Sequence, residues 1–365
     1  MDHTQTRPLE TIAERAHRAG HRVGVATSVS IDHATPAVFY AHQPQRSMYY
    51  EIGTDLAKSG FEFFGGSDFR TPTKKDDPTA RSLYEIVADS GYTVVRGVEE
   101  YKSRAGEVDK IILMQQQEGK DRTCLPFAID RQEDDLTLAQ ITESAIDFLH
   151  RDGKGFFVML EGGKIDWSSH SNDAATSLRE VRDLDDAVRV AYDFYLAHPD
   201  STLIVITADH ETGGMGLGRE GYWLNLKALS SQTLSKAQLS AELAQWGKAN
   251  AKAQTWDNMK TFLADKLGFW RTIQITDKEE ALLKQTFENG FKKNEEKVKS
   301  EYFSDEKLAA VAIDIINRKA NVGWTTGSHS GAYVPVYAIG VDADRFTGVM
   351  ENIDIPRRII EVAGY

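Results

Sequence analysis

The stretch GFFVMLEGGKIDWSSH, residues 155–170, determines how the fold of this chain is interpreted. Its first six residues form a short apolar run typical of a buried strand, and the carboxylate of Glu161 follows at once. Two glycines come next, and then Asp166 and His170 stand four residues apart, so a helical turn would place both on one side. A buried strand that ends in polar side chains predicts an α/β protein whose ligands bind at the carboxyl ends of its strands.

Similar apolar runs alternate with amphipathic helical stretches through most of the 365 residues. This alternation predicts an α/β fold with a mainly parallel central sheet flanked by helices. Before the strand at 155–160, Thr137 and Gln140 predict a capping box at the start of a helix. The expected strands cover residues 22–29, 110–114, 155–160, 202–207 and 334–340.

Residues 221–320 differ from the rest of the chain because strand signals nearly vanish and charged, helix-forming sequence takes over. We therefore predict a helical insertion at 221–320 within an α/β core made of residues 1–220 and 321–365. Thr276 and Glu279 predict a second capping box inside the insertion. We interpret its charged runs as solvated helix faces, with a lid or an oligomer contact as the alternative.

Composition excludes several classes of partner and site. A formal net charge of −12 argues against nucleic acid as a partner, because surfaces that bind phosphate backbones are normally basic. The single cysteine, Cys124, excludes an intramolecular disulfide and a thiolate-rich metal site. No stretch approaches the roughly 20 consecutive apolar residues of a membrane-spanning helix, and the first residues lack the apolar core of a signal peptide.

Asp166, His170 and His329 are the best candidates for one metal site. A carboxylate with imidazoles suits zinc, and a catalytic zinc site takes about three protein ligands and keeps one position open. Asp166 and His170 share one side of a helical turn, and His329 lies in the glycine-flanked turn TTGSHSG. Each histidine taken alone is more often an ordinary core or surface residue.

Two further sets of polar residues follow or precede the expected strands. Asp209 and His210 come just after the strand at 202–207, where a turning backbone would let both side chains reach one ion. Glu161 and the hydroxyl of Thr35 could begin the all-oxygen shell that magnesium prefers. On sequence spacing alone, however, a helix cap before Pro36 is the favoured interpretation of Thr35.

Four sequence strings occur in the order found in alkaline phosphatases, and the chain resembles this family from about Leu9 to its end. The resemblance is greatest to bacterial members with a large helical insertion near the active site. It implies an alkaline-phosphatase-like fold and hydrolysis of phosphate monoesters by two zinc ions and one magnesium ion around a phosphorylated serine. The four strings are IDHATPAVFYAH (31–42), MLEGGKIDWSSHSND (159–173), TADHETGG (207–214) and TTGSHSG (325–331).

The resemblance assigns the five zinc ligands that this chain contains. It implies that Asp166, His170 and His329 bind the first zinc ion. It implies that Asp209 and His210 belong to the second zinc ion. Two zinc ions close together would stabilise the entering and leaving oxygens of an in-line displacement.

The resemblance also assigns residues to magnesium and to the substrate phosphate. Glu161 and Thr35 match magnesium ligands, and His33 lies near the magnesium site. Arg46 matches the arginine that binds the substrate phosphate, for which a planar guanidinium fork is suited. Without the resemblance, Arg46 would be interpreted as a surface residue. Trp167 is expected to line the pocket.

Two parts of the family's site have no counterpart in these 365 residues. One is the nucleophilic serine of an Asp-Ser-Ala motif, and the other is an aspartate that bridges the second zinc and magnesium sites. The one Asp-Ser pair, Asp89 and Ser90, is interpreted as a helix end that runs into a strand. We therefore expect a chain that lacks the N-terminal part of the domain, folds poorly and hydrolyses phosphomonoesters slowly or not at all.

Two other hypotheses compete with a phosphomonoesterase. One is a non-catalytic metal-binding protein, and the other is a different hydrolase of the same superfamily, such as a phosphodiesterase or a sulfatase. Arg46, Thr35 and Glu161 favour the monoesterase. A small phosphomonoester is then the expected partner, and a homodimer remains open. The resemblance predicts a periplasmic or secreted parent protein, although this chain carries no signal peptide.

Overall fold

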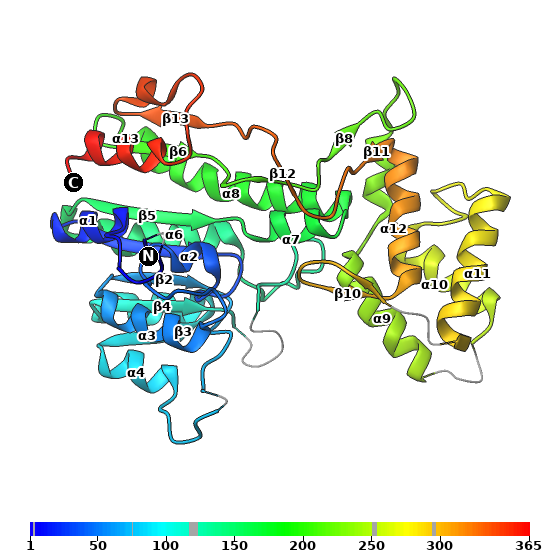
Figure 1. Cartoon of the computed structure of the whole chain (residues 1–365), viewed down its shortest axis with the longest axis horizontal. Coiled ribbons are helices and arrows are strands. Elements are labelled where there is room, and N and C mark those ends of the chain that lie inside the picture. The colour runs from blue at the N-terminus through cyan, green and yellow to red at the C-terminus, as the bar shows by residue number, and fades with distance from the viewer. Residues whose placement is uncertain (3, 75, 117–122, 250–253, 294–296) are drawn as a thin grey trace.

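The computed structural model describes residues 1–365 with the exception of 3, 75, 117–122, 250–253 and 294–296. An α/β part and a helical part lie side by side, and short strands together with helices α7 (Lys164–His170) and α8 (Ala174–Ala197) connect them (Figure 1). In the described residues, no helix has both the length and the apolar character needed to cross a membrane.

A five-stranded sheet forms the centre of the α/β part, with the strand order β3-β4-β2-β1-β5. All four neighbouring pairs run parallel, so their carboxyl ends lie at one edge of the sheet. This confirms the predicted α/β fold with a parallel central sheet. The strands are β1 (Arg22–Thr27), β2 (Phe63–Gly66), β3 (Tyr92–Arg96), β4 (Lys110–Met114) and β5 (Phe156–Glu161).

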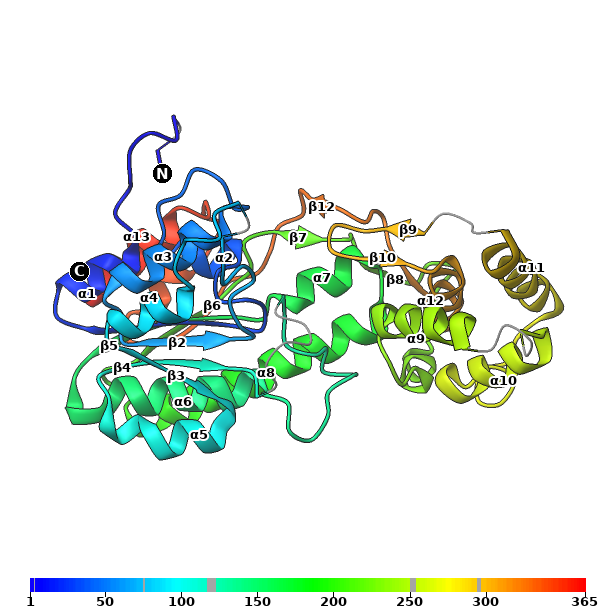
Figure 2. The ribbon, with the colours of Figure 1, turned by 90° about the horizontal axis from the view of Figure 1, so that it is seen from below.

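Helices cover both faces of this sheet, as Figure 2 shows. Neighbouring residues of β2 point to opposite faces, so Phe64 packs into one apolar core and Phe63 into the other. One face is covered by α1 (Ile12–Arg18), α3 (Tyr49–Ser59) and α4 (Leu83–Asp89), and the other by α5 (Gly97–Arg104) and α6 (Leu138–His150). Residues Thr137 and Gln140 form the predicted capping box before α6.

Strand β2 was not predicted from the sequence, because its two glycines resemble a break between elements. Packing explains their presence. A Cβ atom on Gly65 would lie 2.6 Å from the side chain of Ile141, and one on Gly66 would lie 2.5 Å from that of Ile31. The sheet approaches its neighbours so closely here that only residues without side chains fit.

The expected strands at 202–207 and 334–340 form β6 (Leu203–Ile206) and β13 (Tyr337–Gly340), and these pair antiparallel with each other. Among the described strands, neither is hydrogen-bonded to the five-stranded sheet. Two further pairs continue the arrangement: β7 (Glu211–Thr212) with β12 (His329–Ser330), and β8 (Gly216–Leu217) with β11 (Val322–Gly323). Residues 203–217 thus run antiparallel to residues 322–340, and the helical part lies between these two segments in the sequence.

The helical part has an apolar core of its own, whose buried members include Leu243, Met259, Leu283 and Ile313. It consists of α9 (Lys236–Ala249), α10 (Trp256–Leu267), α11 (Asp277–Lys293) and α12 (Lys307–Ala320). Residues Thr276 and Glu279 bond reciprocally as the predicted capping box of α11. A short hairpin of β9 (Val298–Lys299) and β10 (Ser304–Asp305) was not expected. The remaining helices of the α/β part are α2 (Ala34–Ala37) and α13 (Asp354–Ala363).

Asp130 connects the two parts. Its Oδ1 accepts a hydrogen bond of 2.8 Å from the backbone N–H of Ser235. Burial raises the pKa of Asp130 to about 6, although the bonds from Ser235 oppose this shift. The folded chain therefore holds the Asp130 proton more tightly than the unfolded chain does. The resulting stabilisation is present below the ordinary pKa of 3.8 and is lost as the pH rises through 6.

We predict that the free energy of unfolding of Asp130→Asn, relative to that of the wild type, increases by on the order of 2 kcal/mol as the pH rises from about 4 to about 7. The amide carries no charge to desolvate and can still accept the bond from Ser235. Urea unfolding at several pH values measures the difference, with the exposed Glu133→Gln as control. A difference between Asp130→Asn and wild type that is independent of pH would contradict the account.

Candidate metal centre

Helix α7 presents Asp166 and His170 on the same side, as their spacing predicts. The distance between Asp166 Oδ1 and His170 Nε2 is 3.4 Å. The imidazole of His170 is buried, whereas about a quarter of the Asp166 side chain is exposed, at 25%. Helix α7 begins three residues after β5 ends, so both side chains lie beyond the carboxyl end of that strand.

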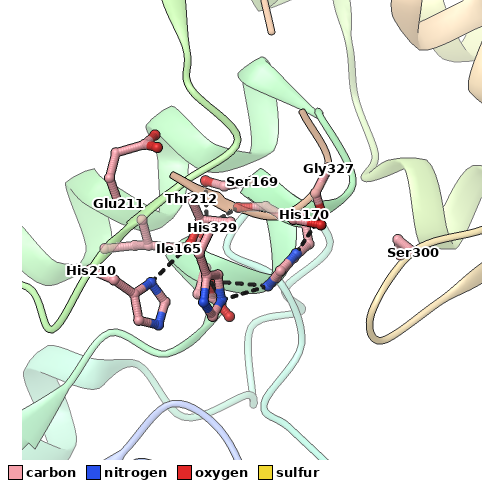
Figure 3. A network of polar contacts seen from close by, with 12 residues as sticks. Ile165, Ser169, His170, His210, Glu211, Thr212, Ser300, Gly327 and His329 are labelled. Atoms are coloured by element: carbon pink, nitrogen blue, oxygen red, sulfur yellow. Dashed lines mark hydrogen bonds and ion pairs between the residues drawn. The ribbon is translucent and has the colours of Figure 1, made fainter. Parts of the chain in front are cut away.

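His329 comes to this helix from the other end of the sequence. It lies opposite Thr212 in the antiparallel pair of β12 with β7. Its Nε2 is 3.2 Å from His170 Nε2 and 3.7 Å from Asp166 Oδ1 (Figure 3). Within the described part of the chain, these three residues are the one group of histidine, cysteine or carboxylate side chains with ligand atoms that all lie within 4.8 Å of one another.

The donor set of this cluster fits zinc. Ligand bonds of about 2.0–2.1 Å in a tetrahedral site place neighbouring ligand atoms roughly 3.3 Å apart, close to the distances found here. The tautomer of His170 is also suitable, because its Nδ1 donates to the carbonyl oxygen of Gly327 at 2.7 Å and leaves the Nε2 lone pair free to bind an ion.

Thr212 was missed in the sequence and supports the carboxylate of the cluster. Its hydroxyl donates a hydrogen bond of 2.6 Å to Asp166 Oδ1 and lies 3.2 Å from Nδ1 of His210. The sequence did contain a signal, because residues two apart on an extended strand share a face, and Thr212 stands two residues after His210.

His210 lies against the cluster, and Asp209 lies at its rim. The ring of His210 stacks on that of His329 with 3.6 Å between centroids and an angle of 22°. The Nε2 atom of His210 is 3.4 Å from Asp209 Oδ2, and the Asp209 side chain is 66% exposed. The structure therefore brings this pair beside the first three residues.

Glu161 and Thr35 also meet, at the carboxyl end of β5. The Glu161 carboxylate accepts a hydrogen bond of 2.5 Å from Thr27 Oγ1, and Thr35 provides a second hydroxyl partner. Thr27 ends the neighbouring strand β1 and was not singled out in the sequence. Burial raises the pKa of Glu161 to about 7, while the bonds from the two threonines oppose the shift.

His33 and Arg46 form a contact next to these carboxylates. The Arg46 guanidinium donates to His33 Nε2 over 3.2 Å. Burial, together with the positive charges of Arg46 and Arg70, lowers the pKa of His33 to about 4. His33 is therefore neutral near pH 7 and can accept the bond. Its Nδ1 atom is buried and has no hydrogen-bond partner among the described residues.

Asp89 and Ser90 lie away from this site. Ser90 caps the C-terminus of α4 and lies just before β3, which places it at the amino end of the strands, opposite the edge where Glu161 lies. Its hydroxyl donates to the carbonyl oxygen of Ile86 at 2.9 Å. The structure thus confirms that this pair is a helix end running into a strand.

Gly213 lets the segment after β7 approach both α7 and the turn that carries His329. Its φ is +88°, and an added Cβ would lie 2.6 Å from the ring of Trp324 and 3.1 Å from the carbonyl oxygen of Ser169. Its backbone N–H donates to the carbonyl oxygen of Ser328 over 3.0 Å. A side chain at this position would separate the two segments.

We predict that Gly213→Ala lowers the free energy of unfolding by about 2–4 kcal/mol, because a left-handed backbone and a steric clash both oppose the new methyl group. Urea denaturation measures the loss. Gly216→Ala is the matched control, since a Cβ on Gly216 would meet nothing within 4 Å. Equal stability of the two variants would show that Gly213 is not needed for this packing.

Comparisons with known proteins give one consistent family. A family model described as Alkaline phosphatase matches residues 2–365. Alkaline phosphatase 3 of Bacillus subtilis (strain 168) is 31% identical over 367 residues, which cover 98% of this chain and 71% of that protein. A cold-active alkaline phosphatase from Shewanella sp. has a TM-score of 0.81 at 28% identity, covering 99% of this chain and 80% of that one. The Thermus thermophilus alkaline phosphatase shares the fold, with a TM-score of 0.73 at 23% identity over 96% of this chain and 72% of that one.

Proposed function

Because the chain belongs to the alkaline phosphatase family, we propose that it hydrolyses phosphate monoesters with a zinc ion held by Asp166, His170 and His329. The geometry of this cluster is the observation that supports the proposal most. Three ligand atoms from segments about 160 residues apart in sequence meet at distances of 3.2, 3.4 and 3.7 Å. Membership of the family supports phosphomonoester hydrolysis in general terms.

The residues around the cluster hold its ligands in place. The carbonyl oxygen of Gly327 fixes the tautomer of His170, and the hydroxyl of Thr212 fixes the Asp166 carboxylate. Such partners raise ligand basicity and limit rotation of the ring. Zinc bound here would act as a Lewis acid that polarises a phosphate oxygen, and it would lower the pKa of a bound water molecule.

The remaining predicted ligands form two smaller sets. We propose Asp209 and His210 as ligands of a second zinc ion and Glu161 with Thr35 as ligands of magnesium. The hydroxyls around Glu161 suit a cation that prefers oxygen ligands. His33 is the residue next to this magnesium position.

Arg46 is the proposed phosphate-binding residue. A guanidinium presents five N–H donors in a planar fork that matches two phosphate oxygens. The contact with neutral His33 uses one of these donors and Tyr302 lies close to the guanidinium as well, so the remaining donors can bind a substrate. The preference for a monoester follows, because a monoester has more charged oxygens to offer such a fork than a diester has.

The 365 residues contain no Asp-Ser-Ala motif. The serine that the family uses as a nucleophile is therefore not identified among them, and we propose that this chain turns over phosphomonoesters slowly. A location in the periplasm or outside the cell remains a prediction from the family.

We predict that the zinc-loaded chain hydrolyses 4-nitrophenyl phosphate and that a chelator abolishes the reaction. His329→Ala should lower the rate by at least about 100-fold, because it removes a ligand from the proposed zinc ion. The measurement is release of nitrophenolate. His198→Ala is the control, since this histidine packs on Phe194 and His150, away from the cluster.

Three outcomes separate the competing functions. Faster hydrolysis of bis(4-nitrophenyl) phosphate or of 4-nitrophenyl sulfate would identify a phosphodiesterase or a sulfatase. Zinc binding without hydrolysis of any of these esters would identify a non-catalytic metal-binding protein. Hydrolysis that persists in His329→Ala or in the presence of chelator would place the reaction elsewhere in the molecule.

A further inference from the structure

Tyr302 is a residue of the helical part of the chain that contacts the proposed active site. It lies in the turn between β9 and β10, a hairpin that runs beside α7 and β12 in Figure 2. Its ring stacks on the buried Trp167 with 4.3 Å between centroids and an angle of 15°. It also meets the ring of His170 edge-on at 5.5 Å.

Tyr302 lies next to both the proposed phosphate-binding residue Arg46 and the proposed zinc ligand Asp166. Its ring centroid is 5.9 Å from that of His33, the residue that accepts a hydrogen bond from Arg46. One phenolic hydroxyl can serve both partners, since it accepts from a guanidinium through its lone pairs and donates its proton to a carboxylate. Arg46 thereby lies beside two acceptors, the oxygen of Tyr302 and Nε2 of His33.

The hairpin is held in place by contacts that do not use the Tyr302 hydroxyl. The backbone N–H of Ser300 donates to the carbonyl oxygen of Phe303 at 2.9 Å. Phe303 meets the rings of Trp167 and Phe127, each at 5.9 Å between centroids. Removal of the hydroxyl alone should therefore leave both the hairpin and the ring stack intact.

The segment that contains Arg46 does little to restrict the conformation of its side chain, so a contact from another segment is needed. It lies in an exposed connection between α2 and α3, outside regular secondary structure. A long side chain on such a connection occupies many rotamers and must give them up when it binds phosphate. A partner that already fixes the guanidinium removes part of that cost before the substrate arrives.

We propose that Tyr302 is a positioning residue of the phosphate site. Its hydroxyl holds the Arg46 guanidinium beside Asp166 in the orientation that binds a phosphate group. This inference rests on the proposed function, because it specifies how the phosphate end of the substrate is recognised. It also gives residues 221–320 a role in that recognition. The helical part supplies the residue that orients the arginine of the α/β part.

The test compares Tyr302→Phe with the wild-type chain, both loaded with zinc. Titration calorimetry with inorganic phosphate should show binding about 5- to 10-fold weaker in the variant, which corresponds to the loss of one ordinary hydrogen bond. The KM for 4-nitrophenyl phosphate should rise by a similar factor, with kcat changed less than about 2-fold. The exposed Tyr333→Phe is the matched control.

A double-mutant cycle separates positioning from a structural role. If Tyr302 acts through Arg46, then Tyr302→Phe should have no further effect on phosphate affinity in an Arg46→Ala background. An equal loss in both backgrounds would overturn the proposal, and so would wild-type phosphate affinity in Tyr302→Phe. Failure of the wild-type chain to bind phosphate would overturn it as well.

The same measurements distinguish failure of the Tyr302 assignment from failure of the proposed function. A wild-type chain that binds phosphate, loses affinity in Tyr302→Phe and hydrolyses no ester would uphold the assignment of Tyr302. It would count against catalysis by this chain.

Discussion

The site depends on one buried carboxylate, that of Asp173. This residue is 1% exposed and accepts hydrogen bonds from Thr176 Oγ1, Gln232 Nε2 and the backbone N–H of Lys236 at 2.7, 2.8 and 2.7 Å. The first partner lies in α8, whose N-terminus Asp173 caps, and the other two belong to the helical part. A buried carboxylate is costly without such donors. The end of α7, the start of α8 and the start of α9 are therefore fixed together.

Lys236 extends this connection toward the hairpin that carries Tyr302. Its Nζ donates to the carbonyl oxygen of Ser171 at 2.7 Å and lies 3.4 Å from Asp305 Oδ2. Burial raises the pKa of Asp305, and the charge of Lys236 opposes that shift. Ser171 is the residue after His170, and Asp305 ends β10. The helical part is thus attached to the same short stretch of chain that holds two of the proposed zinc ligands.

Local sequence signals predicted β5 and the helical turn of α7, which carry Glu161, Asp166 and His170, but long-range pairings decided how these elements meet the rest of the site. The spacing of Asp166 and His170 was sufficient to place both on one side of a helix. His329 reaches them only because residues 322–340 return antiparallel to residues 203–217, and no local signal indicates that pairing. Tyr302 stood in a charged helical region and had no motif. Its position depends on the buried charges around Lys236, which become partners only in the folded chain.

X-ray absorption spectroscopy at the zinc edge of the zinc-loaded chain tests the central claim most directly, namely that α7 and β12 form a zinc site. We predict a first shell with two imidazole nitrogens at about 2.0–2.1 Å and a carboxylate oxygen at about 2.0–2.2 Å. In His329→Ala, one of the two imidazoles should disappear. A shell without imidazole, or one that the substitution leaves unchanged, would contradict the account.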